Sequence, residues 1–176
     1  MQRICVTGPE STGKTTLVQQ LAEALGTEWV PEASREYAER VSRELTVDDV
    51  LPIAREHIAL ADSAARRLTA NGTGVLVLDT DLISTIVYGA HYYGLTSAWL
   101  EAESRARLAD LYLLCDIDVP WIPDGMRDRP ENRDELFALF RDALAERGAR
   151  VVTIRGDWTE RTDAARRAVA GLRQAP

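Results

Sequence analysis

The chain has 176 residues, 45% of them hydrophobic, which is enough for one well-buried core in a single domain. Its 21 Lys and Arg against 28 Asp and Glu give a net charge of −7, which disfavours sequence-independent nucleic-acid binding because that needs a basic surface. No apolar run is long enough to span a membrane and no signal-peptide pattern opens the chain, so we expect a cytoplasmic protein with neither membrane nor nucleic-acid partners.

Short apolar runs alternate along the chain with segments of helical periodicity. Strands are expected at residues 3–7, 28–30, 75–78, 111–115 and 151–154. Helices are expected at residues 14–26, 34–43, 46–69, 133–147 and 160–172 and from residue 82 onward, whereas residues 91–99 lack a regular pattern. Strands separated by helices indicate an α/β fold with a mainly five-stranded parallel sheet between helical layers, formed as one domain over residues 1–176.

Residues 8–15, Gly-Pro-Glu-Ser-Thr-Gly-Lys-Thr, follow the first predicted strand and match the phosphate-binding P-loop pattern. Glycines allow the positive φ and close backbone approach that such a loop needs, Lys14 supplies charge to the β- and γ-phosphates, and Thr15 is placed to coordinate Mg²⁺. An ordinary glycine-rich turn is the competing interpretation. We expect ATP and Mg²⁺ as cofactors, with ATP bound by Gly8, Glu10, Ser11, Thr12, Gly13, Lys14, Thr15 and Thr16.

Acidic residues follow two of the predicted strands, at the sheet edge where ligands of α/β proteins gather. Asp79 and Asp81 come after the third strand, and either could pair with the P-loop hydroxyl at Mg²⁺ or cap the next helix. Glu32 follows the second strand and could accept a proton from a substrate hydroxyl, or be an exposed acid of the next helix. Asp79 is the first candidate for the acidic ligand of Mg²⁺, and Asp81 is the second.

An arginine-containing segment over about residues 124–133 lies between the fourth strand and the next helix. In a phosphate-transfer enzyme, Arg127 and Arg129 would stabilise the moving phosphoryl group from a mobile lid; the alternative is a solvated loop of paired charges. Trp121, just ahead, could stack on a planar cationic ring or cover the sheet edge. Tyr88 could wall a substrate pocket or pack in the core.

The cysteines and histidines carry weaker signals. Cys5 and Cys115 lie inside predicted strands, where buried, reduced thiols are expected. His57 lies in the middle of a predicted helix and is expected to be a surface or satisfied residue. No Cys/His spacing suggests zinc, so metal dependence is expected to come from Mg²⁺ carried by the nucleotide.

Four blocks of the sequence resemble the ribosylnicotinamide kinase domain of the NadR family, a P-loop kinase of the nucleoside and nucleotide kinase type. They are residues 7–16, 29–37, 78–81 and 110–128, in the right order along most of the chain. The Pro-Glu-Ala-Ser-Arg-Glu segment and the Pro-Trp…Asp-Gly…Arg segment are more specific than the P-loop alone. The resemblance implies ATP-dependent phosphorylation of the 5′-hydroxyl of nicotinamide riboside, which gives nicotinamide mononucleotide.

The residue patterns described above and the resemblance together suggest roles for individual residues. Catalysis would involve Lys14, Glu32, Asp81, Arg127 and Arg129, with either Glu32 or Asp81 as the base. The riboside would be bound by Glu32, Arg35, Asp81, Tyr88 and Trp121, with the nicotinamide ring stacked on Trp121. Gly156 and Trp158, after the last strand, form a candidate adenine site.

Two further classes of function compete with the riboside kinase. One is a P-loop kinase for another nucleoside, nucleotide or cofactor precursor, and the other is a regulatory ATPase or GTPase. The sequence has no Asn-Lys-x-Asp guanine-binding segment, since Lys14 is its only lysine, which disfavours a GTPase. Because the first strand begins at Arg3, we expect neither the nucleotidyltransferase nor the repressor function of longer family members. A small-molecule substrate is expected, and a homo-oligomer is left open.

Overall fold

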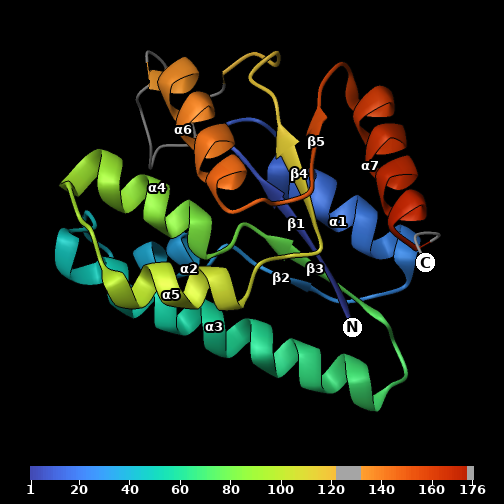
Figure 1. The fold of residues 1–176 in the computed structure, drawn as a ribbon, viewed down its shortest axis with the longest axis horizontal. Coiled ribbons are helices and arrows are strands. Elements are labelled where there is room, and N and C mark those ends of the chain that lie inside the picture. The colour runs from blue at the N-terminus through green and yellow to red at the C-terminus, as the bar shows by residue number, and fades with distance from the viewer. Residues whose placement is uncertain (122–131, 174–176) are drawn as a thin grey trace.

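Within the part of the chain that the structure describes, five parallel strands form a single sheet in the order β2-β3-β1-β4-β5 (Figure 1). The computed structural model describes residues 1–121 and 132–173 of the chain. The strands are β1 (Gln2–Thr7), β2 (Trp29–Val30), β3 (Val75–Asp79), β4 (Leu111–Cys115) and β5 (Val151–Ile154). Every neighbouring pair is parallel, as the alternation of strands and helices predicts.

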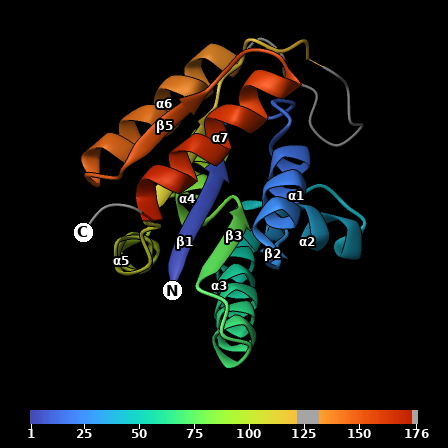
Figure 2. The same ribbon diagram turned by 90° about the vertical axis from the view of Figure 1, so that its right-hand side faces the viewer.

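Helices cover both faces of the sheet. One face carries α1 (Lys14–Leu25) and α7 (Trp158–Arg173), and the other carries α3 (Val47–Ala70), α4 (Leu82–Tyr93) and α6 (Arg133–Glu146). Helix α2 (Ala33–Val41) contacts α3, and α5 (Ala98–Ala106) packs beside α3 and α4. Figure 2 shows α1 and α7 on the side nearer the viewer. The predicted α/β fold with a five-stranded parallel sheet is therefore confirmed.

Alternate residues of each central strand enter the two cores. In β1, Ile4 and Val6 pack with α1 and α7, whereas Cys5 packs on the opposite face. Strand β4 is buried at every position, because helices cover it on both faces, which explains its continuous apolar sequence. Cys5 and Cys115 are both buried and free, and burial raises the pKa of Cys115 to about 11. No helix in the described ranges is both long and apolar enough to cross a membrane.

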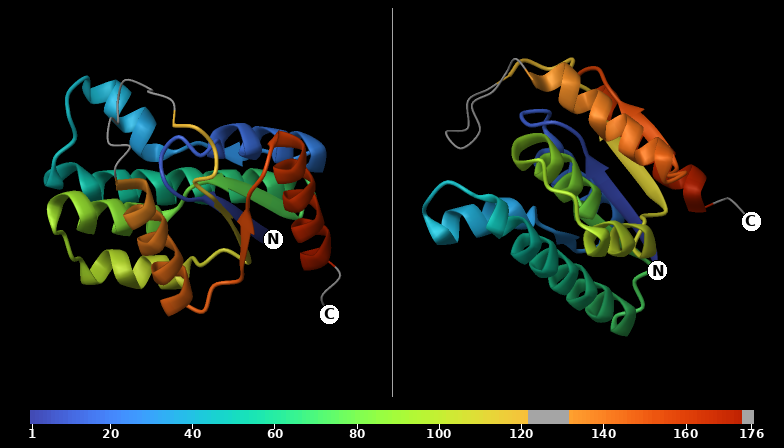
Figure 3. Two further views of the ribbon diagram at one scale, coloured as in Figure 1. Left: turned by 90° about the horizontal axis from the view of Figure 1, so that it is seen from above. Right: turned by 60° about the vertical axis from the view of Figure 1, so that its left-hand side comes forward.

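The strand register brings the chemically interesting residues to one edge. Val6 of β1 lies opposite Asp79 of β3, and Thr7 lies opposite Leu114 of β4. Immediately after Thr7, the backbone of Gly8 approaches β4 so closely that a Cβ would lie 2.8 Å from the Cys115 carbonyl oxygen. The loop between β1 and α1 is therefore held over the carboxyl ends of the central strands, the edge seen from above in Figure 3 (left).

Two local predictions were wrong. Residues 91–93 and 98–99 are helical, because α4 continues to Tyr93 and α5 begins at Ala98, so only residues 94–97 lack regular structure. Between them Gly94, at φ 63°, ends α4 in the left-handed conformation, and the Ser97 hydroxyl accepts the Leu100 N–H at 3.3 Å to begin α5. The second error concerns the start of the last helix, which was predicted at residue 160, whereas α7 begins at Trp158.

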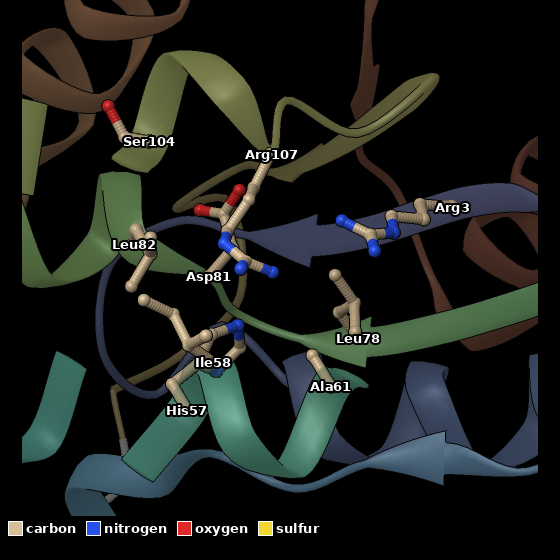
Figure 4. A pocket seen from close by; sticks show the side chains of 9 residues that line it. All are labelled: Arg3, His57, Ile58, Ala61, Leu78, Asp81, Leu82, Ser104 and Arg107. Carbon is tan, nitrogen blue, oxygen red and sulfur yellow. The ribbon is translucent and has the colours of Figure 1, made fainter. Parts of the chain in front are cut away.

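His57 of α3 is buried with 5% of its surface exposed, so the surface position considered for it is wrong. It lines a cavity of about 20 Å³ together with Arg3, Asp81 and Arg107, as Figure 4 shows. Burial, together with the positive charges of Arg107 and Arg3, lowers the pKa of His57 to about 4, although the Asp62 charge opposes the shift. The fold therefore holds this imidazole in its neutral form.

This burial predicts a pH-dependent loss of stability. Since an unfolded His has a pKa near 6.5, the unfolded chain takes up a proton at His57 before the folded chain does as the pH falls. The free energy of unfolding should therefore fall between pH 6.5 and pH 4, by about 3 kcal/mol from this residue alone. Urea denaturation at pH 7, 5 and 4 should show a smaller loss in His57→Gln than in the parent. Equal losses in the two proteins would contradict the prediction.

Candidate active site

The loop from Gly8 to Gly13 adopts the conformation expected of an anion-binding loop. Gly8, Ser11 and Gly13 have φ values of 131°, 53° and 78°. Alternation of left-handed with other residues turns successive backbone N–H groups toward one concavity. The loop also closes on itself, because the Pro9 carbonyl accepts hydrogen bonds at 2.8 Å from both the Thr12 hydroxyl and Lys14 Nζ. Lys14 is buried with 7% exposed, so its charge is directed into the loop and not into solvent.

Helix α1 begins directly after this loop. Gly13 is its N-cap, and no side chain caps it. The first N–H groups of a helix have no intrahelical acceptor, and together with the helix dipole they favour a bound anion. An added Cβ at position 13 would lie 2.4 Å from the Trp158 ring, so a side chain there would force that ring to move. Trp158 thus packs against the P-loop while 48% of its surface stays exposed.

Asp79 at the end of β3 lies next to the P-loop hydroxyl. Thr15 Oγ1 donates a 2.6 Å hydrogen bond to Asp79 Oδ2. The other oxygen, Oδ1, is buried and has no hydrogen-bond partner among the described residues. Burial raises the pKa of Asp79, the Glu32 charge raises it further, and the Thr15 hydrogen bond with the charges of Lys14 and Arg35 opposes this rise. A buried carboxylate with an unused oxygen beside a hydroxyl fits a hard cation such as Mg²⁺.

Glu32 lies in the same region, where β2 leads into α2. It is buried with 5% exposed, and its Oε1 accepts a hydrogen bond from the Ser34 hydroxyl at 2.6 Å. Its negative charge acts on Asp79 strongly enough to raise the Asp79 pKa, and Arg35 acts on Asp79 in the opposite direction. The charges of Lys14, Glu32 and Arg35 therefore all act on the Asp79 carboxyl group. Glu32 is buried, so it is not the exposed acid of the alternative interpretation.

The structure separates the two aspartates that the sequence left as alternatives. Thr80 between them has φ 65°, a strained conformation for a β-branched residue, and its N–H donates to the Val6 carbonyl at 2.9 Å. Beyond this turn, Asp81 caps α4 by accepting the Ile83 N–H at 2.9 Å. Its second oxygen accepts the Tyr112 hydroxyl at 2.5 Å, so both oxygens are used within the fold. Burial raises the pKa of Asp81, and these hydrogen bonds oppose the rise.

The remaining predicted residues lie at several places. Tyr88 stacks on Tyr92 with ring centres 5.8 Å apart and meets Phe140 edge-on at 5.6 Å, so it packs where α4 faces α6. Trp121 is half-buried after β4. Gly156 has φ 92° after β5. The predicted lid, including Arg127 and Arg129, falls on residues 122–131 for its greater part and so lies outside the described residues.

Sequence reasoning missed Arg161. It lies in the first turns of α7 with 1% of its surface exposed, and its guanidinium hydrogen-bonds the Thr12 carbonyl of the P-loop. Nothing in the sequence distinguishes it from the other arginines of α7, because its partners come from distant parts of the chain.

A family model described as an AAA domain, AAA_28, matches residues 3–161, which include the P-loop, Glu32, Asp79 and Arg161. The chain belongs to the AAA_28 family. Two curated relatives of this AAA_28 domain are trifunctional NAD biosynthesis/regulator proteins NadR. The protein of Escherichia coli (strain K12) is 26% identical over 162 residues, covering 88% of this chain and 38% of its own length. The protein of Salmonella typhimurium (strain LT2) is 27% identical over 150 residues, covering 83% and 35%.

Two solved structures have the same fold as this AAA_28 domain. A NadR protein in complex with NR superposes with a TM-score of 0.82 at 26% identity, covering 99% of this chain and 51% of the other. A NadR protein in complex with NAD and AMP-PNP gives a TM-score of 0.76 at 28% identity, covering 99% and 50%. The predicted resemblance to NadR is therefore confirmed. The chain spans less than two-fifths of the curated relatives and about half of the solved chains.

The two glycines that flank α1 provide a test of the nucleotide site. Gly13→Ala should reduce nucleotide affinity by at least about tenfold, because a methyl group would collide with Trp158 and disfavour the φ of 78°. Gly26→Ala is the matched control: its φ is 61°, but nothing lies within 4 Å of an added Cβ. It should lose about 1 kcal/mol of stability and keep its affinity. Titration calorimetry with AMP-PNP and Mg²⁺ measures the affinity of each variant. Equal affinities of Gly13→Ala and Gly26→Ala would refute the assignment of Gly13 to the nucleotide site.

Proposed function

We propose that this chain is an ATP-dependent kinase that phosphorylates the 5′-hydroxyl of nicotinamide riboside, giving nicotinamide mononucleotide. The observation that carries the proposal is the convergence of Lys14, the Thr15–Asp79 pair and Glu32 at the carboxyl ends of the strands. The P-loop supplies a site for a polyphosphate, and Glu32 supplies a carboxylate for an acceptor. Relatives in complex with NR and with AMP-PNP support this choice of acceptor and donor.

The proposed donor is ATP. The P-loop N–H groups and the uncapped start of α1 would bind its phosphates, and Lys14 would move its ammonium group from the Pro9 carbonyl to the β- and γ-phosphates. Ser11, Thr12, Thr15 and Thr16 belong to this binding segment. Trp158, half-exposed against Gly13, and Gly156 are proposed to contact the adenine, since an exposed aromatic face beside the phosphate loop suits a planar base.

Thr15 and Asp79 are proposed to hold Mg²⁺. The described residues contain no group of three or more His, Cys, Asp or Glu side chains that could hold a metal ion, so these two oxygen donors would share the ion with phosphate oxygens. When bound, the ion neutralises charge on the β- and γ-phosphates. The buried Oδ1 of Asp79, which has no hydrogen-bond partner among the described residues, would then have a cation as its partner. The pKa of the Asp79 carboxyl group would fall toward its ordinary value.

Glu32 is proposed as the group that orients the acceptor hydroxyl and takes its proton. Asp81, the other candidate, has both oxygens in hydrogen bonds that hold α4 and Tyr112, so an acceptor would have to displace one of them. A bond forms between the 5′-oxygen and the γ-phosphorus, the bond from that phosphorus to the β–γ bridging oxygen breaks, and the hydroxyl proton passes to Glu32. The products are the 5′-mononucleotide and ADP. Positioning contributes more than base strength to such transfers.

The remaining sequence-based assignments stay proposals. Arg35 lies close enough to act on Asp79 electrostatically and would stabilise charge near the transferring group. Arg127 and Arg129 are proposed to do the same from the predicted lid. Trp121 is proposed to stack on the cationic nicotinamide ring. Tyr88 would line the acceptor side from α4, with Tyr92 and Phe140 fixing its ring.

A coupled ADP-release assay tests the function. With ATP and Mg²⁺, nicotinamide riboside should stimulate ADP release strongly, and mass spectrometry should identify nicotinamide mononucleotide. Lys14→Ala should lower the rate by about 100-fold or more, because a buried charge that stabilises the transferring phosphates is lost. If only other nucleosides stimulate ADP release, the acceptor is one of them and not nicotinamide riboside. Turnover independent of any acceptor would instead indicate a regulatory ATPase.

The two candidate bases can be told apart by neutral, near-isosteric variants. Glu32→Gln should lower kcat by about 100-fold, because it removes the carboxylate that both orients the acceptor hydroxyl and accepts its proton. Asp81→Asn should change kcat by less than about tenfold and instead lower stability by about 1–3 kcal/mol, because it disturbs buried hydrogen bonds to Ile83 and Tyr112. Steady-state kinetics and thermal denaturation of the same preparations separate these effects. The reverse pattern would assign the base to Asp81.

A further inference from the structure

Arg161 joins three segments that surround the nucleotide site. Its Nη1 donates to the Thr12 carbonyl of the P-loop at 3.2 Å. Its Nη2 donates to the Asp116 carbonyl after β4 at 3.1 Å, and its Nε donates to the Gly156 carbonyl after β5 at 2.9 Å. Nη2 also forms an ion pair with Asp118. One side chain thus contacts every described loop that leaves the carboxyl ends of β1, β4 and β5.

Because Arg161 is buried, its guanidinium group depends on hydrogen-bond acceptors within the protein. Only 1% of Arg161 is exposed, and a guanidinium stays charged at any accessible pH, so its N–H groups must find acceptors inside the protein. A guanidinium holds its five donors in a rigid plane, so acceptors that satisfy it are fixed relative to one another. Asp118 adds a second constraint, because its other oxygen accepts the Gly156 N–H at 2.6 Å. The loops after β4 and β5 are therefore tied to each other as well as to the P-loop.

The bond to Thr12 orients a nucleotide-binding group. In a trans peptide unit the carbonyl and the following N–H point in opposite directions. Because the Thr12 carbonyl points to Arg161, the N–H of Gly13 in the same peptide points away from it. Gly13 is the N-cap of α1, where N–H groups are available to an anion. Trp158, three residues before Arg161 and so on the same side of α7, places its ring close to Gly13.

We propose that Arg161 is a positioning residue for nucleotide binding, which sets the orientation of the Thr12–Gly13 peptide and keeps the P-loop in register with the loops after β4 and β5. It touches neither phosphate nor acceptor, and it acts through the backbone that does. The inference rests on nucleotide binding by the proposed kinase, but it is independent of which acceptor is phosphorylated. A purely structural arginine would instead stabilise the fold without favouring one ligand.

The test compares ligand affinity with stability in matched variants. Arg161→Met keeps the length of the stem and removes all donors, and Arg161→Lys keeps the charge but lacks the planar fork. Calorimetry with AMP-PNP and Mg²⁺ should show Kd raised by about 10–100-fold in Arg161→Met and by about tenfold in Arg161→Lys, since charge-assisted hydrogen bonds are lost. The KM for the acceptor should change by less than about twofold. Arg155→Met, which removes an exposed cation paired with Asp116 nearby, should leave Kd unchanged.

Circular dichroism melts show the temperature range in which each variant is folded, and Kd is measured there. If Arg161→Met does not fold, Arg161→Lys and Asp118→Asn are used for the test. Both should weaken the binding of AMP-PNP more than the binding of the acceptor. Unchanged Kd in folded variants, or equal weakening of both ligands, would overturn the inference. A parent that binds AMP-PNP but does not phosphorylate nicotinamide riboside would refute the proposed acceptor alone. A parent that fails to bind AMP-PNP would refute both.

Discussion

The contact between Thr15 and Asp79 depends on the parallel pairing of β1 with β3, and the rest of the site is arranged around it. Parallel register places Asp79 opposite Val6, two residues before the P-loop begins, so the first residues of α1 return to the end of β3. A shift of one residue would turn the Asp79 side chain to the other face of the sheet. The position of the candidate metal ligands is therefore a consequence of backbone hydrogen bonding in the sheet centre.

Several charged groups are buried around this contact, although burial of charge is costly. Lys14 and Arg161 are cations, and Glu32 and Asp79 are anions, each less than 9% exposed. The cations are hydrogen-bonded to backbone carbonyls of the P-loop, whereas Asp79 keeps one oxygen without a partner among the described residues. The P-loop itself carries Lys14 and the uncapped N–H groups at the start of α1. It can therefore attract phosphates although the whole chain is acidic, because phosphates respond to nearby groups and not to the net charge.

Local patterns predicted much of this structure, and the exceptions have physical causes. The P-loop was recognisable because its function requires residue types at fixed spacing within one segment. The start of helix α5 was not recognised, because residues 91–94, His-Tyr-Tyr-Gly, lack a helical pattern and Ser97 follows them without a clear capping signal. Capping and metal binding both use an aspartate at a strand end, so Asp79 and Asp81 could be separated only once Thr80 was seen in its left-handed conformation.

The sequence by itself determined the class of the protein: alternating strands and helices, a phosphate loop after the first strand, and carboxylates after the second and third. These features are local, since periodicity and motif spacing involve residues close together in the chain. Only the tertiary structure decided which carboxylate meets Thr15, that the charge of the buried Glu32 acts on that carboxylate, and that Arg161 contacts two loops more than forty residues before it in the chain. Such contacts depend on strand order and register, which bring together residues that no local pattern relates.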